Sequence, residues 1–245
     1  MWNDRSIDWD RFDLVVVRST WDYPGRREEF LAWAEGLPHV LNSPEVLRWN
    51  TDKRYLEDLG DDAVPTEFLE PGARFVAPDH PYVVKPSIGA GSIGAARYDV
   101  GDHRSATHVA ELHAASQTVL VQPYVEEIDR RGETSLIYVS GEFSHAVRKE
   151  PILIPGGSPA AGGLYVEEQM SPVEAADQEL LLGERVFAAL PFAREELLYA
   201  RIDIVPGPKV LEVELTEPSL FIGYADGGAE RFAAAIAAAA SAEPG

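Results

Sequence analysis

A segment near the carboxyl end of the chain carries the residues best suited to chemistry. Asp203 lies before a Pro206-Gly-Pro208 turn, and Glu212 and Glu214 lie after it. If the two sides pair as strands, alternation places these carboxylates and Arg201 on one sheet face. Oxygen ligands without His or Cys favour Mg²⁺ or Mn²⁺, and Mg²⁺ usually lies between carboxylates and substrate phosphates. The hairpin therefore predicts a metal and nucleotide site. The alternative is a strand with acids on its solvated face.

Composition narrows the possible partners. The 245 residues include 41 Asp and Glu and carry a formal charge of −20, which argues against nucleic acid or an anionic membrane as partner. The absence of Cys excludes disulfides and thiolate sites and fits a cytoplasmic protein. We find no signal peptide or membrane span. We expect small-molecule partners, and the chain could form a homo-oligomer.

Lysine is rare and therefore informative. Only four of the 21 basic residues are Lys, at positions 53, 85, 149 and 209. A helix expected to begin at residues 50–52 places Lys53 in its first turn, where a cation opposes the helix dipole unless an anion lies nearby. Lys85 ends a predicted strand at 82–85. Both are candidates for phosphate contacts, whereas Lys209 lies beside a turn and needs no such role.

A glycine-rich loop follows Lys85 directly. It runs from Ser87 through Gly89, Gly91 and Ser92 to Gly94, and the segment 95–100 after it is too short for the helix of a dinucleotide site. We expect a hairpin whose loop closes over phosphates through its amides. A protein kinase does not fit, because its lysine follows the glycine loop.

The amino-terminal part predicts a buried parallel strand at 13–18. The residues before it leave no room for a partner strand and crossover, so we expect a shortened α/β domain. Open α/β sheets bind ligands at the carboxyl ends of their strands, which makes Arg18, Trp21 and Tyr23 candidate substrate contacts. The alternative is an aromatic-rich turn at the start of a helix.

The remaining elements follow from periodicity and from helix start signals. We expect a helix starting at Ser43-Pro44 and a helix from Ser171-Pro172 to about Leu190. A hairpin at 133–149 ends in adjacent Arg148 and Lys149, and the Gly- and Pro-rich segment 151–163 has the length of a lid. Further strands are predicted at 64–69 and 118–122, and further helices at 28–35, 105–115 and 226–240.

In their order along the chain, these features resemble the ATP-grasp superfamily of carboxylate ligases. Its glutathione-synthetase and ribosomal-protein glutamate-ligase branch is nearest in pattern, and small-molecule cyclo-ligases such as that of D-cycloserine biosynthesis are closer still. The resemblance implies ATP-binding roles for Lys53, Lys85, Ser87, Gly89, Gly91, Ser92, Gln122, Pro123, Tyr124, Val125 and Glu133. It implies catalytic roles for Arg148 and Arg201, metal ligation by Asp203, Glu212 and Glu214, and substrate contacts from the loops that hold Arg18, Trp21, Tyr23, Glu217 and Ser219.

The resemblance also implies the architecture. We expect an α/β (α+β) ATP-grasp fold in which two α+β subdomains, 45–126 and 127–245, grip ATP. A truncated parallel α/β amino-terminal domain, 1–44, precedes them. The expected reaction is ATP- and Mg²⁺-dependent ligation of a carboxylate to an amine through an acyl phosphate. Two alternatives stay open: a cyclo-ligase that closes a small amino-acid derivative, and an ATP- and Mg²⁺-binding protein without turnover.

Overall fold

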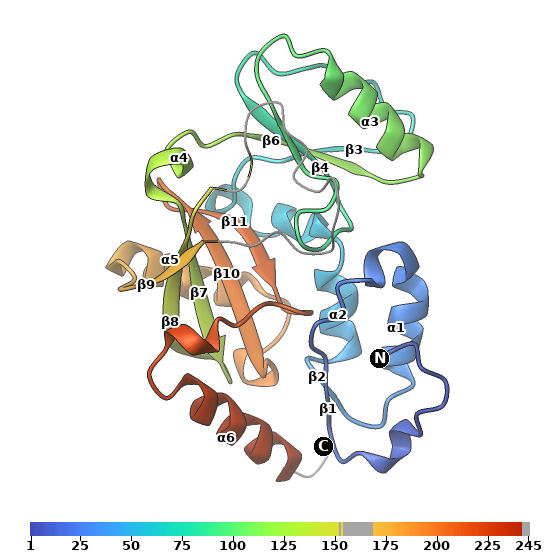
Figure 1. Ribbon diagram of the computed structural model, residues 1–245, viewed down its shortest axis with the longest axis vertical. Coiled ribbons are helices and arrows are strands. Elements are labelled where there is room, and N and C mark those ends of the chain that lie inside the picture. The colour runs from blue at the N-terminus through green and yellow to red at the C-terminus, as the bar shows by residue number, and fades with distance from the viewer. Residues whose placement is uncertain (152, 154–168, 242–245) are drawn as a thin grey trace.

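The computed structural model describes residues 1–151, 153 and 169–241. Its described strands form three sheets (Figure 1): a parallel pair β1-β2, a sheet of order β3-β6-β4-β5 and a sheet of order β11-β10-β7-β8-β9. The fold is the mixed α+β type that the sequence predicts. The segment expected to form a lid lies outside the described residues, apart from Pro151 and Leu153.

The amino-terminal segment is built on a short parallel pair. Strand β1 (Val15–Val16) pairs with β2 (Val40–Leu41), and α1 (Arg27–Glu35) connects them, as a parallel pair requires. Both strands are shorter than the sequence suggests. Aromatic residues provide much of the core: Phe30 is fully buried and Trp2 packs edge-on against it.

The four-stranded sheet has α3 (Arg104–Ala114) packed on it. Its strands are β3 (Glu67–Leu69), β4 (Tyr82–Pro86), β5 (Ala96–Tyr98) and β6 (Val119–Pro123). Buried Val109 and Leu112 of α3 share a core with Tyr82 and Val121 of the sheet. Strands β4 and β5 pair antiparallel. The predicted glycine-loop hairpin is therefore confirmed.

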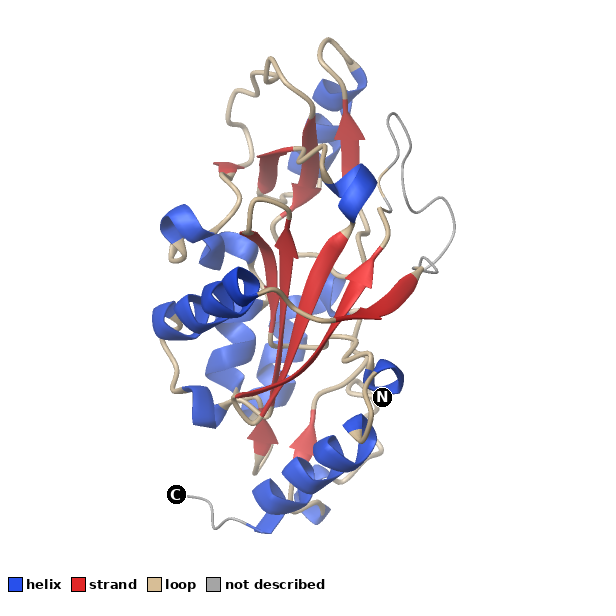
Figure 2. Cartoon of the chain, turned by 90° about the vertical axis from the view of Figure 1, so that its left-hand side faces the viewer, coloured by secondary structure: helices blue, strands red, loops and turns tan. Residues whose placement is uncertain are grey.

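The five-stranded sheet separates two environments. Its strands are β7 (Glu133–Val139), β8 (Glu142–Lys149), β9 (Met170–Val173), β10 (Tyr199–Val205) and β11 (Lys209–Glu214). Helix α5 (Asp177–Ala189) packs against Leu136 and Ile202, whereas α6 (Gly228–Ser241) packs against Ile137 and Tyr199. Because side chains alternate along a strand, these helices cover opposite faces (Figure 2). Asp203 and Arg201 lie on the Tyr199 face.

One expected helix start is wrong. Ser171 and Pro172 belong to β9, where they pair with β8, and the helix begins only at Asp177. The Glu179 carboxylate accepts the backbone N–H of Ala176 at 2.9 Å, which caps the true start. A Ser-Pro pair is equally compatible with an edge strand, and only the pairing with β8 distinguishes the two.

The segment that connects the parallel pair β1-β2 to the four-stranded sheet packs against the five-stranded sheet. Ser43 caps α2 (Pro44–Asn50) as predicted, and a 3₁₀ helix, η3 (Lys53–Glu57), follows in place of the expected α-helix. Val46, Tyr55 and Leu56 share the core of the five-stranded sheet. This segment therefore packs with the sheet that holds the acidic hairpin.

Buried amides attach this segment to β11. Asn50 donates to the Val213 carbonyl at 2.7 Å and accepts the Leu215 N–H at 2.7 Å. Asn42 donates to the Leu215 carbonyl at 2.7 Å and accepts the Leu198 N–H at 2.9 Å. A buried backbone group must find a partner, so the two asparagines fix the hairpin against the amino-terminal part.

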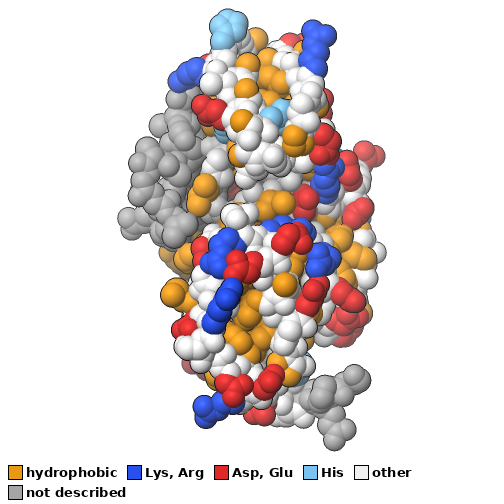
Figure 3. Space-filling view, turned by 90° about the vertical axis from the view of Figure 1, so that its right-hand side faces the viewer, with side chains coloured by type: hydrophobic (Ala, Val, Ile, Leu, Met, Phe, Trp, Pro, Cys, Tyr) orange, Lys and Arg blue, Asp and Glu red, His pale blue; other side chains and the backbone are white. Residues whose placement is uncertain are grey.

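The described helices include none long and apolar enough to cross a membrane. On the face drawn in Figure 3, basic side chains are interspersed with acidic ones and do not gather into a stripe.

We expect Asn50→Ala to lower the free energy of unfolding by about 2–4 kcal/mol, because it leaves buried backbone groups of Val213 and Leu215 without partners. Urea denaturation measures the change. Asn3→Ala is the matched control, since no hydrogen bond of the Asn3 side chain occurs in the described part of the chain, and it should have little effect. A loss below 0.5 kcal/mol for Asn50→Ala would contradict this role.

Candidate active site

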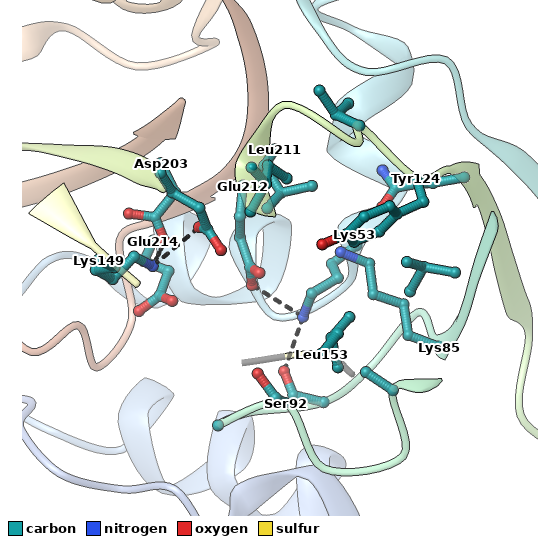
Figure 4. A pocket seen from close by; sticks show the side chains of 18 of the residues that line it. Lys53, Lys85, Ser92, Tyr124, Lys149, Leu153, Asp203, Leu211, Glu212 and Glu214 are labelled. Carbon is teal, nitrogen blue, oxygen red and sulfur yellow. Dashed lines mark hydrogen bonds and ion pairs between the residues drawn. The ribbon is translucent and has the colours of Figure 1, made fainter. Parts of the chain in front are cut away.

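A pocket lies between the four-stranded and five-stranded sheets (Figure 4). It gathers most of the residues predicted to hold nucleotide and metal: Lys53, Lys85, Gly89, Gly91, Ser92, Gln122, Pro123, Tyr124, Val125, Glu133, Arg201, Asp203, Glu212 and Glu214. Predicted residues outside its lining are Ser87, Arg148, Arg18, Trp21, Tyr23, Glu217 and Ser219.

The two lysines enter the pocket from different elements. Asp52 caps η3 and sets Lys53 at its first position, where Nζ contacts the Gly89 carbonyl at 2.8 Å and Glu212 Oε1 at 3.0 Å. Lys85 projects from β4, and the described residues provide no hydrogen bond or ion pair for its ammonium group. Burial lowers the pKa of Lys85. Lys85 is thus a partly buried cation that needs an anion.

The glycine-rich loop has the backbone that its composition predicts. Gly91, Ser92 and Gly94 have φ of 60°, 60° and 75°, in the left-handed region. A Cβ on Gly94 would lie 3.1 Å from the Pro86 side chain, so the close return of the loop requires glycine. Ser87, expected to bind nucleotide, is buried instead, and its backbone pairs with Thr118 and Lys53.

The end of β6 and the residues directly after it form the opposite wall of the pocket. Gln122 donates to Thr66 Oγ1 at 2.8 Å and is thereby oriented. The Arg97 guanidinium lies 3.6 Å from the centroid of the Tyr124 ring, and Asp129 accepts from Arg97 at 3.0 Å. These contacts hold the tyrosine ring in place.

The acidic hairpin forms as predicted, with its carboxylates and Arg201 facing one pocket. Asp203 pairs with Glu212 and Arg201 with Glu214 across the turn. A bulge between Asp203 and Ile204 inserts Leu211 as an extra residue, so Leu211 faces the pocket and Val210 enters the core. Simple alternation would place Val210 on the Glu212 face, and no sequence signal marks the bulge.

Each of these carboxylates is paired with a cation from a different position. Asp203 accepts from Lys149 at 2.9 Å, from Arg201 at 2.9 and 3.0 Å and from Ser135 at 2.5 Å. Glu212 pairs with Lys53, and Glu214 pairs with Arg201. The predicted grouping of the three acids around one cation is therefore not what the side chains adopt. Within the described ranges, no set of three His, Asp or Glu side chains is arranged to hold a metal ion.

The pKa values of the three acids reflect this pairing. Burial opposes ionisation of Asp203, but Arg201 and Lys149 outweigh it and hold the Asp203 pKa far below its usual range. Burial likewise opposes ionisation of Glu212, whose pKa Lys53 and Lys85 lower. Burial raises the pKa of Glu214 to about 7 against the effect of Arg201, and the Glu212 and Asp203 carboxylates add to the rise. Further positive charge near Glu214 would therefore be favourable.

The position of Arg148 differs from the expectation. Its Nη1 donates to the Arg131 carbonyl at 2.7 Å, outside the pocket, while the neighbouring Lys149 contacts Asp203 and lies 3.2 Å from Glu133. Side chains alternate along β8, so Val147 and Lys149 share one face and Arg148 lies on the other. Lys149 therefore faces the pocket in place of Arg148. No site role was predicted for Lys149, although the alternation along this strand could have identified one.

The predicted substrate residues lie where the amino-terminal loop meets the hairpin. Trp21 Nε1 donates to the Glu217 carbonyl at 3.3 Å, and Arg201 Nη1 donates to the Ser219 carbonyl at 3.2 Å. The Arg18 guanidinium lies 5.6 Å from the centroid of the Tyr199 ring.

Tyr23, also predicted to contact substrate, packs within the amino-terminal part. It stacks on Phe30 with ring centroids 5.1 Å apart and is 3% exposed. Tyr23 therefore belongs to the amino-terminal core, because a large aromatic ring next to a short sheet is needed to fill it.

We expect Lys149→Met to destabilise the fold by about 3–5 kcal/mol, because Asp203 and Glu133 lose a buried cation, and to reduce ADP formation at least tenfold. Arg148→Met is the matched control on the next residue and should change both quantities little. Thermal melting and a coupled ADP assay measure the two effects. Equal effects of the two substitutions would contradict the assignment of Lys149 to the site.

Comparison with known proteins identifies the family. The family model of the N-terminal domain of D-cycloserine synthetase DcsG matches residues 1–42. The cycloserine biosynthesis protein DcsG of Streptomyces lavendulae is 37% identical over 259 residues, which cover 96% of this chain and 86% of that protein. A crystal structure of D-cycloserine synthetase DcsG has a TM-score of 0.85 at 34% identity, covering 98% of this chain and 88% of that one.

More distant structures share the fold. D-alanine–D-alanine ligase from Bacillus anthracis, complexed with ATP, has a TM-score of 0.64 at 14% identity, covering 94% of this chain and 79% of that one. The ATP-grasp ligase PsnB, in a complex with Mg and ADP, has a TM-score of 0.60 at 20% identity over 93% and 79%. The predicted resemblance is confirmed. The chain belongs to the ATP-grasp family of the D-cycloserine synthetases and is an ATP-dependent carboxylate–amine ligase.

Proposed function

We propose that this ligase closes a ring within one small amino-acid derivative, joining its carboxylate to an amine of the same molecule. The main support is the similarity to the Streptomyces lavendulae cycloserine protein, which is 37% identical over 96% of this chain. The geometry supports it. The amino-terminal loop lies against the segment that follows the hairpin through the Trp21–Glu217 contact and through the Tyr199 hydroxyl, which donates to the Val17 carbonyl at 2.6 Å, so both segments can contact one small molecule.

ATP takes the part of the pocket between the sheets. The wall at 122–125 and the bulged Leu211 enclose the adenine, and Glu133 accepts from the ribose. Lys85, partly buried and without a counter-ion among the residues described, is placed to contact phosphate oxygens together with Lys53 and the amides of the glycine loop.

Mg²⁺ or Mn²⁺ accompanies the nucleotide in this proposal. The donor chemistry fits, because Asp203, Glu212 and Glu214 offer only carboxylate oxygens and the raised pKa of Glu214 favours added positive charge. Bound there, the ion would neutralise phosphate charge. Binding requires these carboxylates to turn from Lys53, Lys149 and Arg201, with which they pair in the structure.

The reaction has two steps. A substrate carboxylate oxygen attacks the γ-phosphorus, the bond from that phosphorus to the β,γ-bridging oxygen breaks, and ADP leaves. The amine nitrogen then attacks the acyl carbon, the carbon–oxygen bond to phosphate breaks, and the nitrogen releases a proton. Arg201, which bridges Asp203 and Glu214, is placed to stabilise charge on the transferred phosphoryl group. Arg18 is a candidate clamp for the carboxylate substrate.

The proposed activity can be tested with β-aminooxy-D-alanine, the open-chain form of D-cycloserine. We expect the wild-type protein with ATP and Mg²⁺ to release one ADP per ring formed, measured by a coupled ADP assay and mass spectrometry of the product. Asp203→Asn should reduce the rate at least 100-fold, because it removes a charge from the proposed metal site but keeps the side-chain volume. Linear amides formed only when a second amine is added would instead show intermolecular ligation.

We expect Lys85→Met to weaken binding of a non-hydrolysable ATP analogue by at least tenfold, because a partly buried cation facing the phosphates is lost. Lys209→Met is the control, since Lys209 lies at the hairpin turn and contacts the Asp61 carbonyl. Calorimetric titration measures both affinities. Equal losses would count against the phosphate role of Lys85.

A further inference from the structure

Glu217 differs from the other acids of the site. Its side chain is buried, with the residue 7% exposed, yet no hydrogen bond or ion pair of its carboxylate occurs within the part of the chain that the structure describes. Asp203, Glu212 and Glu214, by contrast, each contact a cation. An unpaired buried carboxylate is costly, so its retention requires a partner or a compensating function.

The backbone around Glu217 is held without using its side chain. Its carbonyl accepts from Trp21 Nε1, the preceding Thr216 carbonyl accepts from the Tyr199 hydroxyl at 2.9 Å, and the Ser219 carbonyl accepts from Arg201. These bonds come from the amino-terminal loop and from β10. They hold the segment around Glu217 against Arg201, which itself pairs with Asp203 and Glu214.

The charged and titratable groups around this carboxylate are Tyr23, Tyr199, Lys53, Arg201, Glu212 and Glu214. The two cations are already paired with Glu212 and with Asp203 and Glu214. Burial and the Glu214 carboxylate raise the pKa of Glu217 well above its ordinary value. A cation brought by a ligand would therefore meet an environment with excess negative charge.

The adjoining loop provides a second, independent sign of a polar ligand. Thr20 Oγ1 and Arg18 Nη1 are buried and have no hydrogen-bond partner among the residues that the structure describes. Both belong to the loop of Trp21, whose indole contacts the Glu217 carbonyl. Buried polar atoms without protein partners can be satisfied by a bound polar ligand.

We propose that the Glu217 carboxylate binds the substrate's ammonium group that takes no part in the reaction. This inference rests on the proposed ring closure, in which an aminooxy nitrogen attacks the acyl phosphate and the α-ammonium group remains intact. An ammonium donates to a carboxylate through charge-assisted hydrogen bonds. Glu217 would then select α-amino acids over carboxylates that lack the amine, and it would orient the carboxylate towards Arg201.

The test compares two probes that differ only in the α-amine: β-aminooxy-D-alanine and 3-aminooxypropanoate. Each is titrated by calorimetry into the protein saturated with Mg²⁺ and a non-hydrolysable ATP analogue. We expect the wild-type protein to bind the amino acid about 10- to 100-fold more tightly, and Glu217→Gln to bind the two probes equally. Glu67→Gln, an exposed residue on β3, is the matched control and should retain the wild-type preference.

The outcomes separate this inference from the proposed reaction. A preference that survives in Glu217→Gln, or a wild-type protein that binds both probes equally or neither, overturns the role of Glu217. A preference lost only in Glu217→Gln, with unchanged affinity for the ATP analogue and unchanged melting temperature, supports it. If that preference occurs without ring formation, the proposed reaction fails and the ammonium site stands.

Discussion

The site depends on the compensation of buried carboxylates by cations from distant parts of the chain. Lys53 comes from η3, Lys149 from β8 and Arg201 from β10, and all three converge on the acids of one hairpin. Removing one partner of a buried ion pair leaves an uncompensated charge, which is strongly destabilising. The network therefore links the arrangement of these elements to the chemistry of the pocket.

The five-stranded sheet places this network and the hydrophobic core on opposite faces. Residues such as Ile202 and Leu136 pack under α5, while the alternate positions present Asp203 and Ser135 to the pocket. The period of two along a strand allows a dry core and a charged site within one sheet. The same segment contributes both residues of the hydrophobic core and charged side chains that line the pocket.

The amino-terminal segment is small but closely attached to the site. Asn42 and Asn50 bond to the backbone around β10 and β11, and Tyr199 donates to the Val17 carbonyl. These contacts bring the loop after β1 beside the segment that follows the hairpin. A short parallel pair can thus position a loop next to the hairpin without a large domain of its own.

The sequence by itself determined the local features: the presence of the acidic hairpin, the glycine-loop hairpin and the approach of Lys53 and Lys85 to one pocket. Turn composition and alternation carry that information, and the order of the motifs identified the family. The tertiary structure alone decided that Leu211 bulges into the pocket, that Ser171 and Pro172 lie in a strand, and that Tyr23 enters the core. It also decided which buried charges have partners. These features depend on strand pairing and burial between residues far apart in the chain, which local sequence patterns do not encode.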